Sequence, residues 1–184
     1  MKKTFTLIET IIVIGVLGLF IPTIFIIIFT LSREQLKINR LSLIKREGDY
    51  LINNLSLLIK NNAYSIHSSD PPDDLNIVCN KEEVFSSLEK LIFKDKDNNW
   101  FKISLNNDKI SSYSSINNQS LFLNSNKIKI YNFSISCQNS SFYSSPIINL
   151  NFDICYKGSK NNCISTQEEI ANLHYQTKIK LRNY

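Results

Sequence analysis

Three successive patterns of hydrophobic and polar residues divide this chain. Residues 5–31 are apolar on every side, which predicts a helix that faces lipid. Over residues 32–62 apolar positions recur at spacings of three, four and seven, as on one face of an amphipathic helix. That face contains Ile44, Leu51, Leu55 and Leu58. Since no stop signal separates the two stretches, we predict one continuous helix to about residue 62.

A period of two replaces the helical pattern from about residue 75 onward. The stretches EKLIFKDKDNNWFKISLNNDKISSYS, KIKIYNFSIS, PIINLNFDICY and HYQTKIKLRNY alternate apolar and polar positions and are rich in β-branched and aromatic residues. Turns rich in Asn and Ser separate them. We predict an antiparallel sheet of five to seven strands over residues 75–184, packed on the second half of the helix. The predicted fold class is therefore α+β.

The apolar stretch also predicts a single membrane crossing. Residues 10–32, between Glu9 and Arg33, carry no charge. As a helix they would extend about 35 Å, enough to cross a hydrocarbon core of about 30 Å. Lys2 and Lys3 precede the stretch without an acidic neighbour, so the positive-inside rule places the N-terminus in the cytoplasm and everything after Arg33 outside.

All four cysteines lie on the predicted outer side, where disulfides persist. They are Cys79, Cys137, Cys155 and Cys163. Three pairings are open to four cysteines, and the short interval between Cys155 and Cys163 favours a bridge there, which leaves Cys79 with Cys137. A zinc site is the competing interpretation of the cysteines, but the chain has no CxxC or HxxxH spacing. We expect the two histidines, His67 and His174, to be ordinary surface residues.

The net charge of +5 does not by itself indicate an acidic partner. Basic residues of the later part mostly alternate with apolar ones, as on the solvated face of a sheet, so the pattern does not favour nucleic acid as a partner. These residues are Lys102, Lys109, Lys127, Lys129, Lys178 and Lys180.

Motifs for catalysis, cofactors and metals are weak or missing. The stretch DKDNN, residues 95–99, begins like a calcium loop, but Trp100 occupies the position of the loop glycine and Asn106 the position of the bidentate Glu. We interpret it as a polar hairpin turn. Without a P-loop, a GxSxG or a paired-His helix, we expect neither an enzyme nor a bound cofactor or metal.

Glu9 raises the sharpest question, because a carboxylate inside a bilayer costs about 2.5 to 3.5 kcal/mol on insertion scales. It either reaches the headgroups at the cytoplasmic interface or finds a partner of opposite charge. Gly15, Gly18 and Pro22 interrupt the same segment. Glycine and proline are common in membrane helices, but together they also mark a stretch that can unwind when neighbouring helices pack around it.

The short basic leader, the sequence FTLIE and the long apolar run together resemble the N-terminal signal of type IV pilins and pseudopilins. The resemblance implies a four-residue leader, residues 1–4, that a prepilin peptidase removes between Thr4 and Phe5. It also implies N-methylation of Phe5 and pairing of Glu9 with the amino terminus of an adjacent subunit. The family usually has Gly before the cut, where this chain has Thr4.

Later segments carry the same resemblance less specifically. KREGDYLINNLSLLIKNNAYSI, FLNSNKIKIYNFSIS and YQTKIKLRNY are similar to J-type minor pseudopilins of type II secretion and their type IV pilus counterparts. The resemblance implies a structural subunit whose partners are other pilin or pseudopilin subunits, the prepilin peptidase and membrane lipid, in a cell-surface or periplasmic filament. Two alternatives stay open: a pilin-like module that binds DNA or an adhesion target, and an uncleaved membrane-anchored protein.

Overall fold

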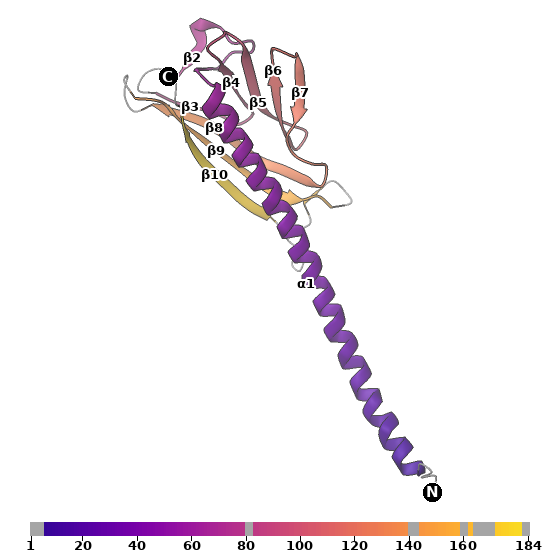
Figure 1. Ribbon diagram of the computed structural model, residues 1–184. Coiled ribbons are helices and arrows are strands. Elements are labelled where there is room, and N and C mark those ends of the chain that lie inside the picture. The colour runs from indigo at the N-terminus through magenta and orange to yellow at the C-terminus, as the bar shows by residue number, and fades with distance from the viewer. Residues whose placement is uncertain (1–5, 80–82, 140–143, 159–161, 164–171, 182–184) are drawn as a thin grey trace.

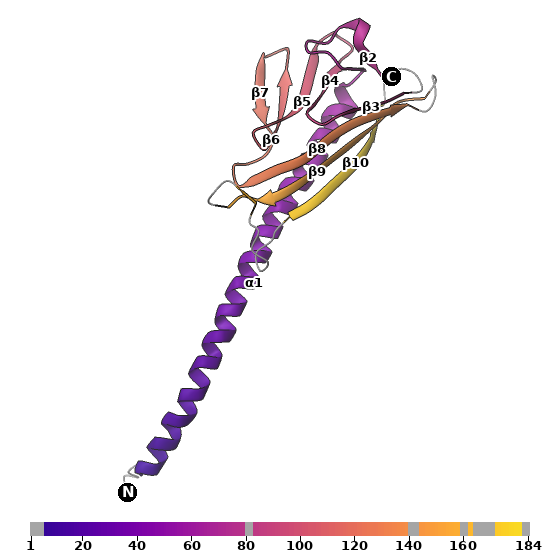
Figure 2. The same ribbon diagram turned by 180° about the vertical axis from the view of Figure 1, so that it is seen from behind.

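A single helix, α1 (Leu7–Asn62), links an exposed apolar rod to a folded β domain in the computed structural model of the chain (Figures 1 and 2). The structure describes residues 6–79, 83–139, 144–158, 162–163 and 172–181. The helix ends at Asn62, where the pattern places its end, because Ala63 has an extended backbone and donates its N–H to the Ile59 carbonyl at 2.9 Å.

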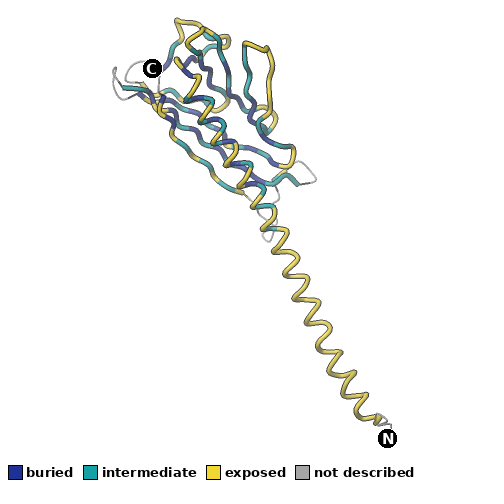
Figure 3. Tube along the Cα trace, viewed as in Figure 1, coloured by how far each residue is buried: buried dark blue, intermediate teal, exposed yellow. Residues whose placement is uncertain are grey.

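Only the second half of α1 packs on the β domain (Figure 3). Its buried residues are Ile44, Gly48, Leu51, Leu55 and Ile59. They are spaced by three and four, so they form one face of the helix. The first half, from Leu7 to Leu36, is exposed throughout.

The described residues of the β domain form two antiparallel sheets. The six-stranded sheet has the order β2 (Ile77–Val78), β1 (Ser65–His67), β4 (Lys90–Lys94), β5 (Trp100–Asn106), β6 (Lys109–Ser114) and β7 (Gln119–Phe122). The four-stranded sheet has the order β10 (Asn172–Lys180), β9 (Ile147–Tyr156), β8 (Ile128–Asn139) and β3 (Glu83–Ser87). A short 3-10 helix, η1 (Asp74–Asn76), precedes β2.

The α+β class is as predicted, but the single sheet of five to seven strands is wrong, because ten described strands divide into two sheets. The β structure also begins at Ser65 and not at residue 75. Strands β1 and β2 are too short to show an alternation, and β7 is exposed at all four positions. The predicted strands of residues 89–114 and of the three later stretches correspond to β4, β5, β6, β8, β9 and β10.

Gly48 lets α1 approach the four-stranded sheet closely. A Cβ atom at this position would lie 2.3 Å from ring carbons of Tyr175 on β10. That ring stacks on Phe152 with centroids 5.5 Å apart, and its hydroxyl donates to the Lys45 carbonyl at 3.1 Å and to Asp49 Oδ1 at 3.3 Å. Burial and the Asp49 carboxylate raise the pKa of Tyr175 to about 12, so the hydroxyl remains a donor at physiological pH.

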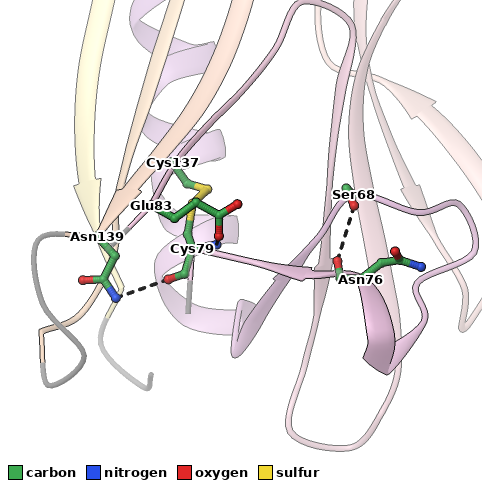
Figure 4. Close-up of a disulfide and its surroundings, with 6 residues drawn as sticks. All are labelled: Ser68, Asn76, Cys79, Glu83, Cys137 and Asn139. Carbon is green, nitrogen blue, oxygen red and sulfur yellow. Dashed lines mark hydrogen bonds between the residues drawn. A yellow bond between two sulfur atoms is a disulfide. The ribbon is translucent and has the colours of Figure 1, made fainter. Parts of the chain in front are cut away.

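Two disulfides, Cys79–Cys137 and Cys155–Cys163, have the predicted pairing. Cys79 follows β2 and Cys137 lies on β8, so this bridge ties the six-stranded sheet to the four-stranded sheet. Figure 4 shows its surroundings: the Cys79 carbonyl accepts from Asn139 Nδ2 at 3.2 Å, and the Cys79 N–H donates to Glu83 Oε2 at 3.2 Å. In the same view Ser68 Oγ donates to the Asn76 carbonyl at 3.4 Å.

We expect the two bridges to contribute unequally to stability. The sequence separations are 58 residues for Cys79–Cys137 and 8 for Cys155–Cys163, so chain entropy gives about 4 and about 2.5 kcal/mol respectively. Cys79→Ala with Cys137→Ala should therefore lower the free energy of unfolding more than Cys155→Ala with Cys163→Ala. Chemical denaturation of the full chain in detergent measures both values, and an equal loss from the two double variants would contradict the expectation.

His67 is buried, with 1% of its surface exposed, so the expectation of a surface residue is wrong for it. Nε2 lies 2.9 Å from Ser65 Oγ and Nδ1 lies 2.9 Å from the Asp73 carbonyl oxygen. Burial is the main cause that lowers the pKa of His67 below 6.5, although the hydrogen bond to Asp73 opposes it. The other histidine, His174, is exposed, and its Nδ1 lies 2.7 Å from Asp153 Oδ1.

The depressed pKa of His67 predicts an acid-sensitive fold. The unfolded chain binds a proton here below about pH 6.5, whereas the folded protein does so only at lower pH. Stability is therefore full above pH 6.5 and declines as the pH falls below it, by at most about 1.4 kcal/mol per pH unit. Thermal melts at pH 7.5 and 5.5 should show a smaller decline for His67→Gln than for the unmodified chain, while the exposed-site control His174→Gln should keep the decline. An identical decline in His67→Gln would assign the effect to other groups.

Candidate assembly site on the N-terminal helix

The first half of α1 is an apolar surface without a cover inside the subunit. Its best 18-residue window has a mean hydropathy of 3.0, and none of that window is buried. Within the described ranges, α1 is the one helix that is long and apolar enough to cross a membrane. Large side chains such as Leu19, Phe25 and Ile26 are 75, 67 and 66% exposed. Such a surface requires lipid or other apolar helices around it.

The hydroxyl groups in this half are compatible with an apolar environment, because each donates to a carbonyl of the preceding turn. Thr10 donates to Leu7 at 2.7 Å, Thr23 to Phe20 at 2.7 Å, Thr30 to Ile26 at 2.9 Å and Ser32 to Ile28 at 2.8 Å. These bonds satisfy the hydroxyl donors within the helix, as hydrocarbon surroundings demand.

Glu9 forms a capping box with Thr6 at the start of α1. Its Oε2 accepts from the Thr6 N–H at 2.9 Å and from the Thr6 hydroxyl at 3.0 Å, while the Glu9 N–H donates to Thr6 Oγ1 at 3.4 Å. This cap was not predicted. The signal was present, because Thr6-Leu7-Ile8-Glu9 has the spacing Ser/Thr-x-x-Glu that precedes many helices.

The cap directs the Glu9 carboxylate toward the beginning of the chain. A negative group at this end of a helix interacts favourably with the helix dipole and with N–H groups that have no partner in the helix. The carboxylate therefore lies where an amino terminus could meet it. Thr4 and Phe5, the predicted cleavage and methylation positions, lie outside the described residues, so both assignments stay predictions.

The predicted unwinding stretch is helical in the isolated subunit. Gly15, Gly18 and Pro22 all lie within α1, and a Cβ atom at either glycine would meet nothing within 4 Å. No contact among the described residues therefore requires glycine at these two positions. That this stretch unwinds when neighbouring helices pack around it stays a prediction.

The stretch DKDNN is the turn between β4 and β5, as the hairpin interpretation predicts. Asp95 Oδ1 accepts from the N–H groups of Asp97 at 2.9 Å and Asn99 at 2.8 Å, which closes the turn. The carboxylate is thus used by its own backbone. Among the described residues no group of three or more His, Cys, Asp or Glu side chains could hold a metal ion.

Several lysines of the six-stranded sheet are paired with aspartates. Asp70 Oδ2 lies 2.7 Å from Lys102 Nζ and 3.3 Å from Lys90 Nζ, and Asp74 Oδ1 lies 2.8 Å from Lys94 Nζ. The hydrogen bond from Lys102 is the largest cause of the lowered pKa of Asp70. On β8, Lys129 pairs with Asp108 at 3.1 Å. Of the six lysines in the predicted strand pattern, Lys102 and Lys129 are thus paired with a carboxylate.

Comparisons of the chain with protein-family models, with curated proteins and with solved structures found no match. The arguments for a function therefore come from the helix and from the N-terminal residues.

Proposed function

We propose that this chain is a minor pilin or pseudopilin, a structural subunit of a type IV pilus or a type II secretion-like filament, and that a prepilin peptidase processes it. One observation carries the proposal. A continuous helix has a lone acidic residue, Glu9, in its first turn, an apolar exposed half behind it, and a folded domain on its second half. The resemblance of FTLIE to the prepilin signal supports the same assignment.

The exposed half of α1 suits both places that such a subunit occupies. In the membrane, lipid covers it, with the N-terminus in the cytoplasm and the β domain outside. The two disulfides support an oxidising, extracytoplasmic location of the domain. In a filament, helices of neighbouring subunits would replace the lipid. Because both surroundings are apolar, the transfer sideways out of the bilayer does not expose this surface to water.

Glu9 gives assembly a charged contact. Among the described residues, its carboxylate accepts neutral donors from Thr6. The amino group of a neighbouring mature chain, beginning at Phe5, is a cationic donor and forms a stronger, charge-assisted bond. Within a bundle of apolar helices this pair also sets the position of one subunit along the other, because an unpaired carboxylate there would be costly.

A DNA-binding or adhesive module is the second candidate function. The lysine–aspartate pairs of the two sheets weaken the DNA version of this idea, because phosphates would have to compete with Asp70, Asp74 and Asp108. We therefore place the structural role first.

Intact mass of the membrane-extracted protein tests the processing step. We expect the loss of residues 1–4 and the addition of one methyl group at Phe5. Inhibition or deletion of the prepilin peptidase should return the mass to that of the full chain. A full-length, unmethylated product in peptidase-positive cells would instead support the uncleaved membrane anchor.

The role of the Glu9 charge can be separated from its role in the cap. Glu9→Gln removes the charge but keeps a side chain that also functions in capping boxes, whereas Thr6→Val removes the two bonds of the Thr6 hydroxyl and keeps the carboxylate. We expect Glu9→Gln to reduce incorporation into filaments by more than about tenfold, since loss of one partner of a buried ion pair costs about 3 to 5 kcal/mol. Thr6→Val should have a much smaller effect.

Quantification of each variant in sheared filaments, relative to its amount in the membrane, measures incorporation. Both variants should keep the disulfides and the thermal melt of the β domain, because residues 6–36 are exposed and the first half of α1 extends away from the sheets (Figure 1). Normal incorporation of Glu9→Gln would refute the pairing role.

A further inference from the structure

A cleft of about 650 Å³ lies between the last two turns of α1 and the end of β10. We define the α1–β10 cleft by Ser56 and Lys60 on the helix and by Lys178, Ile179 and Lys180 on the strand. Ile179 is buried, whereas both lysines of the strand are exposed. The cleft is thus a polar, positively charged hollow beside the core of the domain.

The cleft continues the line along which α1 and β10 run side by side. Closer to the rod, the Tyr175 hydroxyl donates to Asp49 Oδ1 at 3.3 Å. Asp49, Ser56 and Lys60 are separated by seven and four residues, so they lie on the same side of the helix. From Asp49 to Lys60 the helix rises about 17 Å, and from Tyr175 to Lys180 the strand extends about 17 Å. The cleft therefore lies at the end of the domain away from the rod (Figure 1).

The positive charge of the cleft has no counterpart in the described part of the chain. Lys60, Lys178 and Lys180 line it, and none of its described lining residues is an aspartate or glutamate. Among the described residues, none of the three lysines forms an ion pair. By contrast, Asp70 and Asp74 pair with three lysines of the six-stranded sheet. The cleft lysines can therefore bind carboxylates that come from another molecule.

The edge of β10 adds backbone donors and acceptors to these charges. The Leu181 N–H donates to the Pro146 carbonyl at 3.3 Å, in register with the pairing of β10 and β9. Because backbone groups alternate in direction along a strand, the N–H and C=O groups of Lys178 and Lys180 face away from β9. In the described ranges no strand pairs with this edge. An extended segment can therefore add to it as a further strand.

The two lysines of β10 restrict which segment can add. Lysines on an edge strand normally prevent pairing with other strands. An acidic segment is the exception, because opposite charges on neighbouring strands attract each other. The same side chains thus reject a basic segment and select an acidic one.

Lipid headgroups and nucleic acid match the cleft less well than a polypeptide does. About 40 Å of helix separates Lys60 from Arg33, which ends the uncharged stretch, so headgroups at the outer end of a membrane span would not reach the cleft. Phosphates of a nucleic acid would bind the lysines, but they offer no donors to the C=O groups of the β10 edge. An extended polypeptide with carboxylate side chains uses both features.

We propose that the α1–β10 cleft binds an extended, acidic segment of a partner protein. Its backbone pairs with Lys178 and Lys180 along the edge of β10. Carboxylates on one face of the segment bind the ammonium groups of these two lysines, which lie two residues apart on one face of the strand. A carboxylate on the other face binds Lys60, which approaches from α1. The inference does not depend on the proposed function, because such binding requires the folded domain and no filament.

Peptide binding to the full chain in detergent micelles tests the proposal. The probe is a fluorescein-labelled peptide of about ten residues, rich in Glu with interspersed Val and Thr, which have strand propensity. We expect saturable binding by fluorescence anisotropy that weakens at least about fivefold when NaCl is raised from about 0.05 M to about 0.3 M, because salt screens exposed charges. The same peptide with Lys in place of Glu should not bind. Absence of saturable binding by the Glu peptide would overturn the proposal.

A matched pair of double variants locates the site. Lys178→Gln with Lys180→Gln removes two charges from the cleft, and Lys127→Gln with Lys157→Gln removes two charges at the other end of the four-stranded sheet. We expect the cleft variant to bind the Glu peptide about fivefold more weakly and the control variant to bind within about twofold of the unmodified chain. Thermal melts should show both folded, because all four side chains lie outside the core. An equal loss in the two variants would overturn the assignment to the cleft.

Amide hydrogen exchange, followed by NMR, separates strand addition from attraction by charge alone. Binding of the Glu peptide should slow exchange of the Lys178 and Lys180 amides, which face the open edge. Unchanged exchange at these two amides in the complex would overturn strand addition. Equally tight binding of inorganic phosphate or of a single-stranded oligonucleotide, in competition with the peptide, would identify a general anion site and also overturn the proposal. None of these results depends on assembly, so the pilin assignment stands or falls by its own tests.

Discussion

The structure depends on the unequal burial of one helix. The β domain buries one face of α1 from Ile44 to Ile59, and below that point the helix extends alone, with large apolar side chains on every side. Roughly 25 cal/mol of hydrophobic free energy accompanies each Å² of apolar surface removed from water. Burial of this half therefore favours association strongly, and lipid or sister helices must provide it. One helix is therefore both a part of the domain core and an exposed surface that needs apolar surroundings.

The close contact between α1 and the β domain fixes the orientation of the domain relative to the helix. Gly48 brings the helix backbone against the ring of Tyr175, whose hydroxyl binds the helix at Lys45 and Asp49. The Cys79–Cys137 bridge then joins the two sheets. An alanine at position 48 would gain helix propensity of about 1 kcal/mol, but overpacking against the ring costs about 1 to 3 kcal/mol, so glycine is favoured here. The direction of the rod thus determines where the outer surface of the β domain is presented.

Long, regular secondary-structure elements could be predicted from the sequence, whereas short strands and tertiary contacts could not. The apolar run, the spacing of Ile44, Leu51 and Leu55 and the alternation of the later strands predict the helix and six of the strands. The number of strands was underestimated because β1 and β2 are too short to carry a pattern. The division into two sheets was missed because it depends on which strands pair, and alternation along a strand does not specify its partners. The burial of His67 was equally hidden, since one of its partners is a backbone carbonyl, that of Asp73. The spacing of Thr6 and Glu9 was sufficient to predict their cap. In the isolated subunit the carboxylate accepts hydrogen bonds from Thr6 of its own chain.

Assembly as we propose it requires Glu9 to exchange these local donors for the amino terminus of another subunit. A cryo-electron microscopy structure of filaments that contain this chain, at a resolution that shows side chains, would test this exchange directly. We expect a Glu9 carboxylate oxygen within about 4 Å of the terminal nitrogen of Phe5 in a neighbouring subunit. A carboxylate that stays on its own Thr6, with no amine of another chain beside it, would refute the exchange.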